Sequence, residues 1–212
     1  MWIAIAIVLA AVAAAVLAQL LLPRIAARRI ERRLTGSGGV AAVTVAAVPA
    51  LLLLGARGDR LVVRGSGLTI GLGEASEGTA GGLRALDGFT DVDVELTDLR
   101  AGPFAIAALA LVRRASGPFA MAAEGSVTGA ELARSGESWL RSAIPGGPLI
   151  GAAARNLPLG ARSVPVAFEI ELHSEEEGLR VGSGGGTIAG YPAGPIATTI
   201  AAAVARRLEI AP

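Results

Sequence analysis

The sequence contains no cysteine, which excludes disulfide bonds, thiolate catalysis and cysteine metal sites. It also contains no lysine, so all 19 basic residues are arginines and a nucleotide-binding P-loop, which needs a lysine, is excluded. Aromatic residues are scarce at 3% of the chain, too few for the stacking surfaces that bind single-stranded nucleic acid. The formal net charge is only +1, so no strong positive field attracts nucleic acid either. We therefore expect no nucleic-acid partner.

Residues and motifs that carry catalysis are also few. His173 is the only histidine, and it falls on the polar side of a predicted strand, where an exposed side chain is the simpler interpretation than a general base. No serine stands in a G-x-S-x-G elbow. The glutamates at 175–177 are most simply a hairpin turn, with metal binding as the alternative. The glycine-rich run 182–186 is most simply a flexible turn, although its backbone N–H groups could hold a phosphate. We expect no enzyme, no catalytic or metal-ligating residue and no cofactor.

Apolar residues, by contrast, are abundant, at 52% of the chain. The stretch from Trp2 to Leu22 carries no charge, and Gln19 is its only strongly polar side chain. At ~1.5 Å per residue such a helix spans ~30 Å, the thickness of the hydrocarbon core of a bilayer. The sequence therefore predicts a transmembrane anchor over residues 1–23.

Five arginines follow the anchor within ten residues, at 24, 28, 29, 32 and 33. Helical spacing places Leu22, Ala26, Ile30 and Leu34 on one stripe of this segment and Arg24, Arg28 and Arg32 on another. The segment either continues the anchor helix as a stop-transfer flank or lies as a basic helix on anionic headgroups. Glycine and serine at 36–39 end it. We assign residues 24–39 to a basic juxtamembrane helix and linker, and residues 40–212 to one further domain.

Beyond the linker the apolar pattern changes to period two, which is typical of strands with one buried face. The clearest strands are residues 91–97 and 163–173. Residues 104–112, which could instead be helical, and 119–127 are expected to be strands joined at Gly117 and Pro118. Shorter strands are expected at 40–45, 61–64, 68–72, 179–181 and 187–189.

Three helices are expected in this domain. Pro49 suits the first position of a short helix through residues 51–54, and residues 129–141 and 196–208 form longer ones. The fold class is therefore α+β: a curved antiparallel sheet wrapped around one or two helices, preceded by the transmembrane helix. The buried face is rich in alanine, valine and leucine, so it must collapse, recruit a helix or hold a guest such as an acyl chain.

One part of the sequence resembles a known family. Residues 43–58 and 61–68 follow a pattern of valine-rich strand, proline, leucines, glycine and second strand that is similar to the LmeA-like family of bacterial envelope lipid-binding proteins. Residues 91–99, 125–132 and 157–172 resemble it too, so the likeness covers roughly residues 26–181 and leaves 182–212 outside.

The resemblance implies a fold related to tubular lipid-binding proteins, with an apolar groove for phospholipid, and a place on the extracytoplasmic side of a bacterial membrane. The positive-inside rule applied to the arginines after the anchor indicates the cytoplasmic side instead. We adopt the extracytoplasmic side, which requires a start upstream of Met1 or an exception to the charge rule.

We expect a single-pass membrane protein that binds phospholipid in support of the cell envelope, with lipid transfer as an extension of the same activity. The alternative is a non-enzymatic scaffold or adaptor that binds an envelope protein partner through the surface of its sheet. Trp139 is either a core residue or lies at the mouth of the groove, and the loop 145–148 would bring Leu149 and Ile150 to the bilayer. The groove candidates are Leu51, Leu54, Phe104, Ile106, Trp139, Phe168, Ile170, Ile200 and Val204. The candidates for membrane contact are Trp2, Leu22, Arg24, Arg28, Arg32, Leu149 and Ile150.

Overall fold

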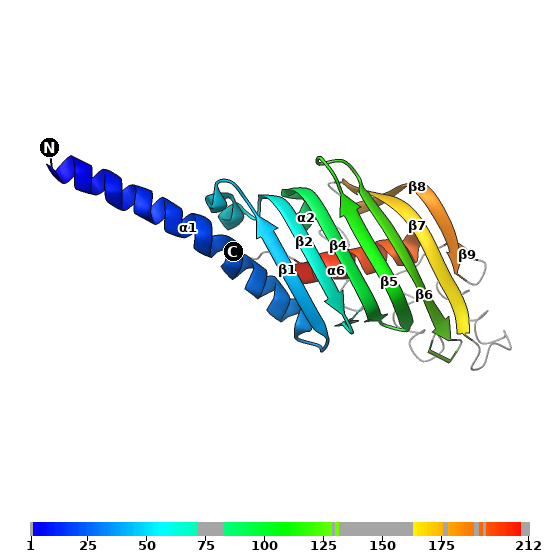
Figure 1. The fold of residues 1–212 in the computed structure, drawn as a ribbon. Helices are drawn as coiled ribbons and strands as arrows, with labels where there is room; N and C mark the ends of the chain where they lie inside the picture. Colours follow the sequence, from blue (N-terminus) through cyan, green and yellow to red (C-terminus); the bar gives the residue numbers. More distant parts are fainter. Residues whose placement is uncertain are drawn as a thin grey trace.

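The computed structural model describes residues 2–71, 83–128, 130–131, 163–175, 178–188, 191–192 and 194–208. It shows a long N-terminal helix, a curved sheet of mostly antiparallel strands that does not close, and a C-terminal helix behind the sheet (Figure 1). The expected α+β class, with a sheet wrapped around a helix and an apolar N-terminal helix in front, is confirmed.

The N-terminal helix α1 (Trp2–Thr35) runs without a break through Pro23. Its first twenty residues project away from the sheet and are largely exposed, whereas its second part lies along strand β1 (Figure 1). The predicted apolar stripe is the face that packs on the sheet, since Ala26, Ile30 and Leu34 are buried. The segment thus continues the anchor helix, and its core contacts join residues 24–35 to the folded domain.

The sheet has the strand order β1-β2-β4-β5-β6-β7-β8-β9, with the short β3 beside β4. The pairs β2–β4 and β3–β4 are parallel and the others antiparallel. The larger strands are β1 (Val40–Ala46), β2 (Gly58–Ser66), β4 (Phe89–Ala101), β5 (Phe104–Arg113), β6 (Phe119–Thr128), β7 (Ser163–Glu175) and β8 (Gly178–Ile188). The shorter ones are β3 (Thr69–Ile70) and β9 (Tyr191–Pro192).

Alternation along each strand gives the sheet an inner, apolar face and an outer, exposed face. Two features shift this alternation near one end of the sheet: Asp98 in β4 has a φ of 50°, and the β5–β6 register shifts between Ile106 and Ala108. Such irregularities bend strands and increase their twist, which contributes to the curvature of the sheet. The inner face carries, among others, Val43, Leu61, Val63, Val92, Val94, Leu109, Leu111, Met121, Phe168 and Ile170, all buried.

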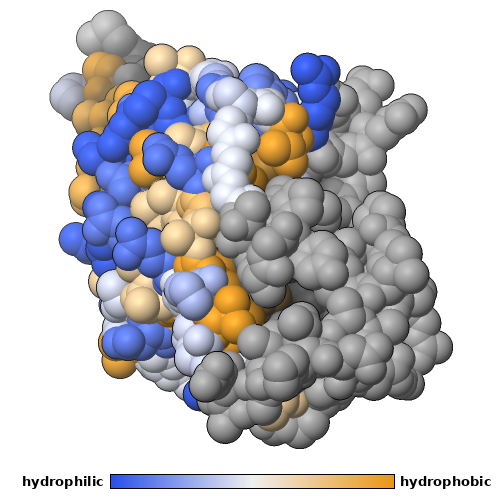
Figure 2. All heavy atoms as spheres, turned by 90° about the vertical axis from the view of Figure 1, so that its right-hand side faces the viewer, coloured by the Kyte–Doolittle hydropathy of each residue, from blue (hydrophilic) through white to orange (hydrophobic). Residues whose placement is uncertain are grey.

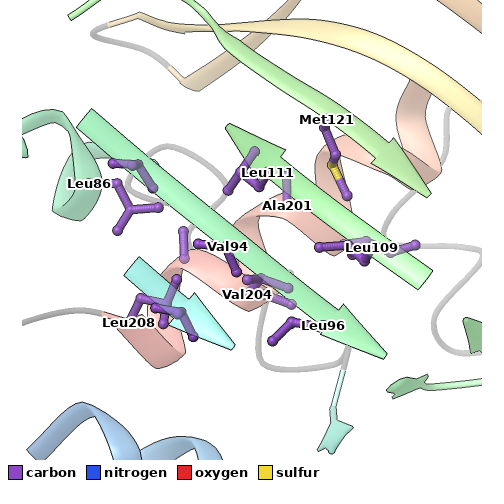
Figure 3. Close-up of a cluster of buried hydrophobic side chains, with 14 of the residues drawn as sticks. Leu86, Val94, Leu96, Leu109, Leu111, Met121, Ala201, Val204 and Leu208 are labelled. Carbon is purple, nitrogen blue, oxygen red and sulfur yellow. The ribbon is translucent and has the colours of Figure 1, made fainter. Parts of the chain in front are cut away.

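Helix α6 (Gly194–Leu208) covers the inner face. Residues 200–205 are all buried, and six successive helical positions point in every direction, so this part of α6 is enclosed on all sides. Ala201, Val204 and Leu208 face the side chains of β4, β5 and β6 (Figure 3). The short helix α2 (Arg84–Asp87), which we did not predict, adds Leu86 to this cluster.

The structure corrects some local predictions and confirms others. Pro49 precedes the 3₁₀ helix η1 (Ala50–Gly55) as its N-cap instead of occupying its first position. Residues 104–112, for which a helix was the alternative, form strand β5. The glycine run 182–186 is no turn, because it lies inside β8 and joins the two short strands expected at its ends. The helix expected at 129–141 lies outside the described residues except for Ala130 and Glu131, which are helical.

The glycines of β8 are needed because that strand approaches β7 very closely. A Cβ at Gly184, whose φ is +105°, would lie 2.3 Å from the carbonyl oxygen of Glu169, and one at Gly186 would lie 2.6 Å from the Cβ of Phe168. Both distances are too short for a side chain, so the run serves strand packing. Glu175 ends β7 and pairs with Gly178 at the start of β8, whereas Glu176 and Glu177 of the predicted turn lie outside the described residues.

Candidate functional site

Six of the groove candidates meet in the core behind the sheet. They have exposed fractions between 1% and 5%, so they pack against one another and do not line an open groove. Strands β5 and β7 supply four of them and helix α6 supplies two. They are Phe104, Ile106, Phe168, Ile170, Ile200 and Val204.

All four phenylalanines of the chain are buried, at positions 89, 104, 119 and 168. The phenylalanine rings thus lie in the core, and an alanine-rich helix covers the apolar face beside them. Composition alone left open how the apolar face is covered. The structure shows that a helix from this chain covers it.

The remaining groove candidates lie elsewhere. Leu51 and Leu54 belong to η1 and are 56% and 64% exposed, whereas Leu53 between them is buried at 4%. They are distant from α6 in the sequence, and η1 contacts α1 in the structure. Trp139 lies outside the described residues, as do Leu149 and Ile150.

The other expected membrane-contact residues all lie on α1. Trp2 is 81% exposed, Leu22 is partly buried against the sheet, and Arg24, Arg28 and Arg32 are exposed. In the described part of the chain, α1 is the one helix long and apolar enough to cross a membrane, and none of its most apolar stretch is buried. An unburied helix of this kind would be unstable in water, since it exposes apolar side chains on every side.

A hollow of about 650 Å³ lies on the outer face, where β4 and β5 are irregular. Its base consists of small side chains, including Ala105, Ala107 and Ala167, and its charged side chains are Asp98, Arg100 and Glu124. Gly125 deepens it, because a Cβ there would lie 2.4 Å from the carbonyl oxygen of Ala105. No local sequence pattern indicates this hollow, since it depends on the register of four strands, β4 to β7.

The β8–β9 side of the molecule carries both hydrophilic and hydrophobic residues. Figure 2 shows hydrophilic residues over much of the described surface and hydrophobic residues along the border with the grey atoms.

A network of ion pairs crosses the outer face of β2, β4 and β5. Arg64 contacts Asp93 at 3.0 Å and Glu95 at 3.0 Å, and Arg114 contacts Asp93 at 3.3 Å. The hydrogen bond from Arg64 holds the pKa of Asp93 below its ordinary value, although burial of this carboxylate opposes the effect. The network neutralises a nearly buried charge and is therefore part of the packing, with no unpaired group poised for chemistry.

A second polar group joins β7 and β8. The hydroxyl of Ser183 donates to Glu171 at 2.6 Å, and this bond, with the nearby His173 as a smaller cause, lowers the pKa of Glu171. His173 is exposed, as expected, and it lies against Gly182, where a Cβ would be 2.6 Å from its Nε2 atom. Within the described ranges no three side chains of the metal-binding types gather as a metal site.

No protein-family model matches the chain, and no curated protein or solved structure matches it either.

Proposed function

We propose that this chain is a membrane-anchored, non-enzymatic domain that binds phospholipid and supports a bacterial cell envelope. The observation that carries the proposal is the inner face of the sheet, which is apolar from β1 to β7 and curves around a single helix. An acyl chain placed on such a face gains ~0.8 kcal/mol for each CH₂ that leaves water. The motifs at residues 43–68, 91–99 and 157–172 that resemble the LmeA-like family support the same function.

Binding on the inner face requires helix α6 to move, because its contacts with the sheet are closed. The side chains that α6 contributes are mostly small, including Ala197, Ala201 and Ala205, so each contributes little buried area. An acyl chain that took the place of α6 would restore the apolar contacts that the helix gives up. The exchange therefore has a lower free-energy cost than the removal of a helix with bulky side chains.

Helix α1 supplies the anchor in this proposal. It brings the domain to the surface of the membrane from which lipid is taken, on the extracytoplasmic side that the resemblance implies. Arg24, Arg28 and Arg32 would then lie at the headgroups of the outer leaflet, where they can contact lipid phosphates.

Photocrosslinking tests the proposal directly. The full chain would be reconstituted in vesicles that contain phosphatidylglycerol with a photoreactive group near the end of one acyl chain. We expect crosslinked peptides from β5, β7 and α6 in addition to those from α1. Crosslinks confined to α1 and η1 would contradict lipid binding by the domain.

A pair of variants separates binding under α6 from accidental labelling. Ile200→Val combined with Val204→Ala loosens α6 from the sheet, so we expect faster crosslinking of β5 and β7. Val112→Ala removes similar volume from the outer side of β5 and should leave the rate unchanged. Equal rates in all three proteins would show that α6 does not control access.

A second function is favoured by the hollow on the outer face. Its alanine base between charged side chains suits a protein segment that lies across β4, β5 and β6, as a scaffold or adaptor in the envelope would require. In that case lipid would crosslink to α1 alone, and charge reversal at Arg100 and Glu124 would release the protein partner from detergent extracts. The crosslinking pattern thus distinguishes the two functions.

A further inference from the structure

Four large apolar side chains are exposed together on the connection between β1 and β2. Val48, Leu51, Leu52 and Leu54 have exposed fractions of 74%, 56%, 38% and 64%. Leu53 and Ala50 point the other way and are buried, so η1 is held firmly on the domain while its leucines face outward. Single exposed leucines are ordinary on a protein surface, but a contiguous apolar group indicates a contact with something apolar.

The side chain of Gln19 fixes where this group lies. Its Nε2 atom donates to the carbonyl oxygen of Ala47 at 2.8 Å, and its Oε1 atom accepts from the backbone N–H of Ala50 at 2.7 Å. Gln19 is the only strongly polar residue in the apolar part of α1, and both ends of its amide are engaged with the loop. Figure 1 shows the short coil of η1 beside α1 at the point where the long helix leaves the sheet.

The position of Gln19 along α1 sets the depth of the loop. At the rise of an α-helix, Gln19 lies about 7.5 Å from Arg24, the first charged residue, on the apolar side. If α1 spans a bilayer, η1 is therefore level with the boundary between acyl chains and headgroups. Apolar side chains gain contacts at this depth that water cannot offer.

The charges around the loop suit the same boundary. Arg57 and Arg60 follow η1 and are exposed. The nearest acidic group, Asp59, accepts a hydrogen bond from the backbone N–H of Val48 at 2.8 Å and so belongs to the turn. The leucines of η1 suit contact with acyl chains, and the arginines that follow them suit contact with anionic headgroups.

We propose that the 47–57 loop, the segment from Ala47 to Arg57, is a second membrane contact beside the transmembrane helix. Its occupant is the bilayer, because the loop is continuous with the membrane-facing surface of α1. The inference rests on the proposal that α1 spans a membrane, but it does not require the domain to bind lipid. Two contacts fix the tilt of the sheet, with the starts of β2 and β4 nearest the bilayer and the bulged end farthest from it.

Because the chain has no cysteine, single cysteines can report the environment of each position. Leu51→Cys, Leu54→Cys, Val12→Cys and Ala105→Cys would each carry an environment-sensitive fluorophore in the full chain, reconstituted in phosphatidylglycerol–phosphatidylcholine vesicles. Val12 lies in the apolar part of α1, and Ala105 lies on the outer face at the far end of the sheet. Val12 lies in α1, and the other three positions lie outside it. All four positions are exposed, so labelling should leave the fold intact.

We expect spin-labelled lipids to quench the labels at 51, 54 and 12, whereas the label at 105 responds only to iodide in the water. If iodide quenches the labels at 51 and 54 while lipid still quenches the label at 12, the loop lies in water. That result would overturn the second membrane contact but not the membrane anchor. Protection at 51 and 54 from both quenchers would mean that protein covers the loop, which also overturns it. Lipid quenching of the label at 105 would contradict the proposed tilt of the sheet. If lipid did not quench the label at 12, both the membrane anchor and the second contact would be overturned.

Discussion

Asp93 shows how a single charged residue is held on the outer face of a sheet. Its carboxylate is only 11% exposed, because the guanidinium groups of Arg64 and Arg114 lie over it. Arg64 comes from β2 and Arg114 follows β5, so the charge is held from both neighbouring strands. A buried carboxylate is stable only when charged partners of this kind replace the water that it has lost.

The change Asp93→Asn tests this arrangement. It keeps the size of the side chain but removes the charge that faces Arg114 and leaves Arg64 with Glu95 alone. We therefore expect a loss of about 1–3 kcal/mol in the free energy of unfolding at neutral pH. Urea titration of the full chain in mild detergent measures it. Glu95→Gln is the matched control, because Glu95 is 57% exposed and its ion pair with Arg64 should contribute less than about 1 kcal/mol.

The pH dependence of this difference follows from the lowered pKa of Asp93. A carboxyl whose pKa is lower in the folded than in the unfolded protein adds stability at pH values above its ordinary value, 3.8. That stability is lost as the pH falls through the lower, folded pKa. The difference between the wild type and Asp93→Asn should therefore shrink in acid. A difference that stays constant down to pH 2 would assign the effect to shape instead of charge.

At the scale of elements, β8 is the least conventional strand. Five of its eleven residues lie in the glycine-rich run 182–186, of which only Ser183 has a side chain beyond the backbone. Glycine normally weakens a strand, because it loses more conformational entropy on folding than other residues do. Here close contact with β7 leaves no room for a Cβ at Gly184 or Gly186, and Gly184 also has a positive φ.

Neighbouring glycines of β8 offer a matched pair of substitutions. Gly184→Ala places a Cβ against the backbone of Glu169 at a left-handed φ, so we expect a loss of about 1–3 kcal/mol in unfolding free energy. Gly185→Ala meets nothing within 4 Å and should change stability by less than about 0.5 kcal/mol. Thermal melting in detergent measures both. Equal effects would mean that β8 does not pack on β7 as described.

Helix α1 combines two roles within one element. Its first part has the exposure of a helix without protein neighbours, and its second part contributes Ala26, Ile30 and Leu34 to the core. Glu31 adds a polar contact, since its carboxylate accepts the backbone N–H of Val43 at 3.0 Å on the free edge of β1. The helix thus covers an edge strand that would otherwise be open to pairing with other chains.

At the scale of the whole molecule, the anchor and the domain form one structural unit. The second half of α1 also contacts α6, where the guanidinium of Arg207 donates to the carbonyl oxygen of Arg33 at 3.2 Å. Helix α1 is therefore coupled to the helix behind the sheet, and movement of α6 would be transmitted to α1. If α1 spans a membrane, this coupling links the proposed lipid site to the bilayer.

Truncation tests whether the second part of α1 belongs to the folded domain. A chain that begins at Leu22 keeps the buried face of α1, whereas one that begins at Val40 loses Ile30 and Leu34 from the core and uncovers the edge of β1. Burial of two such side chains contributes about 3–6 kcal/mol, so we expect the shorter chain to be less stable by that amount and to aggregate. Urea titration and size-exclusion chromatography measure the two effects. Equal stability would separate residues 24–39 from the domain.

Much of the secondary structure could be predicted from the sequence because periodicity is local. The alternation at residues 91–97 and 163–173 marks buried and exposed sides wherever a strand lies, and the i, i+4 stripe of Ala26, Ile30 and Leu34 does so for α1. Length and lack of charge were likewise enough to identify a helix long enough to cross a membrane.

The candidate site depended on contacts between distant segments, which no local pattern contains. Leu51 and Leu54 were assigned to a groove on hydropathy alone, yet the bonds from Gln19, about thirty residues away, place η1 beside α1. The hollow on the outer face likewise exists only because irregularities in β4 and β5 coincide in register. The sequence by itself determined which side chains leave water. The tertiary structure decided which of them meet, because strand pairing and helix packing are settled by the chain as a whole.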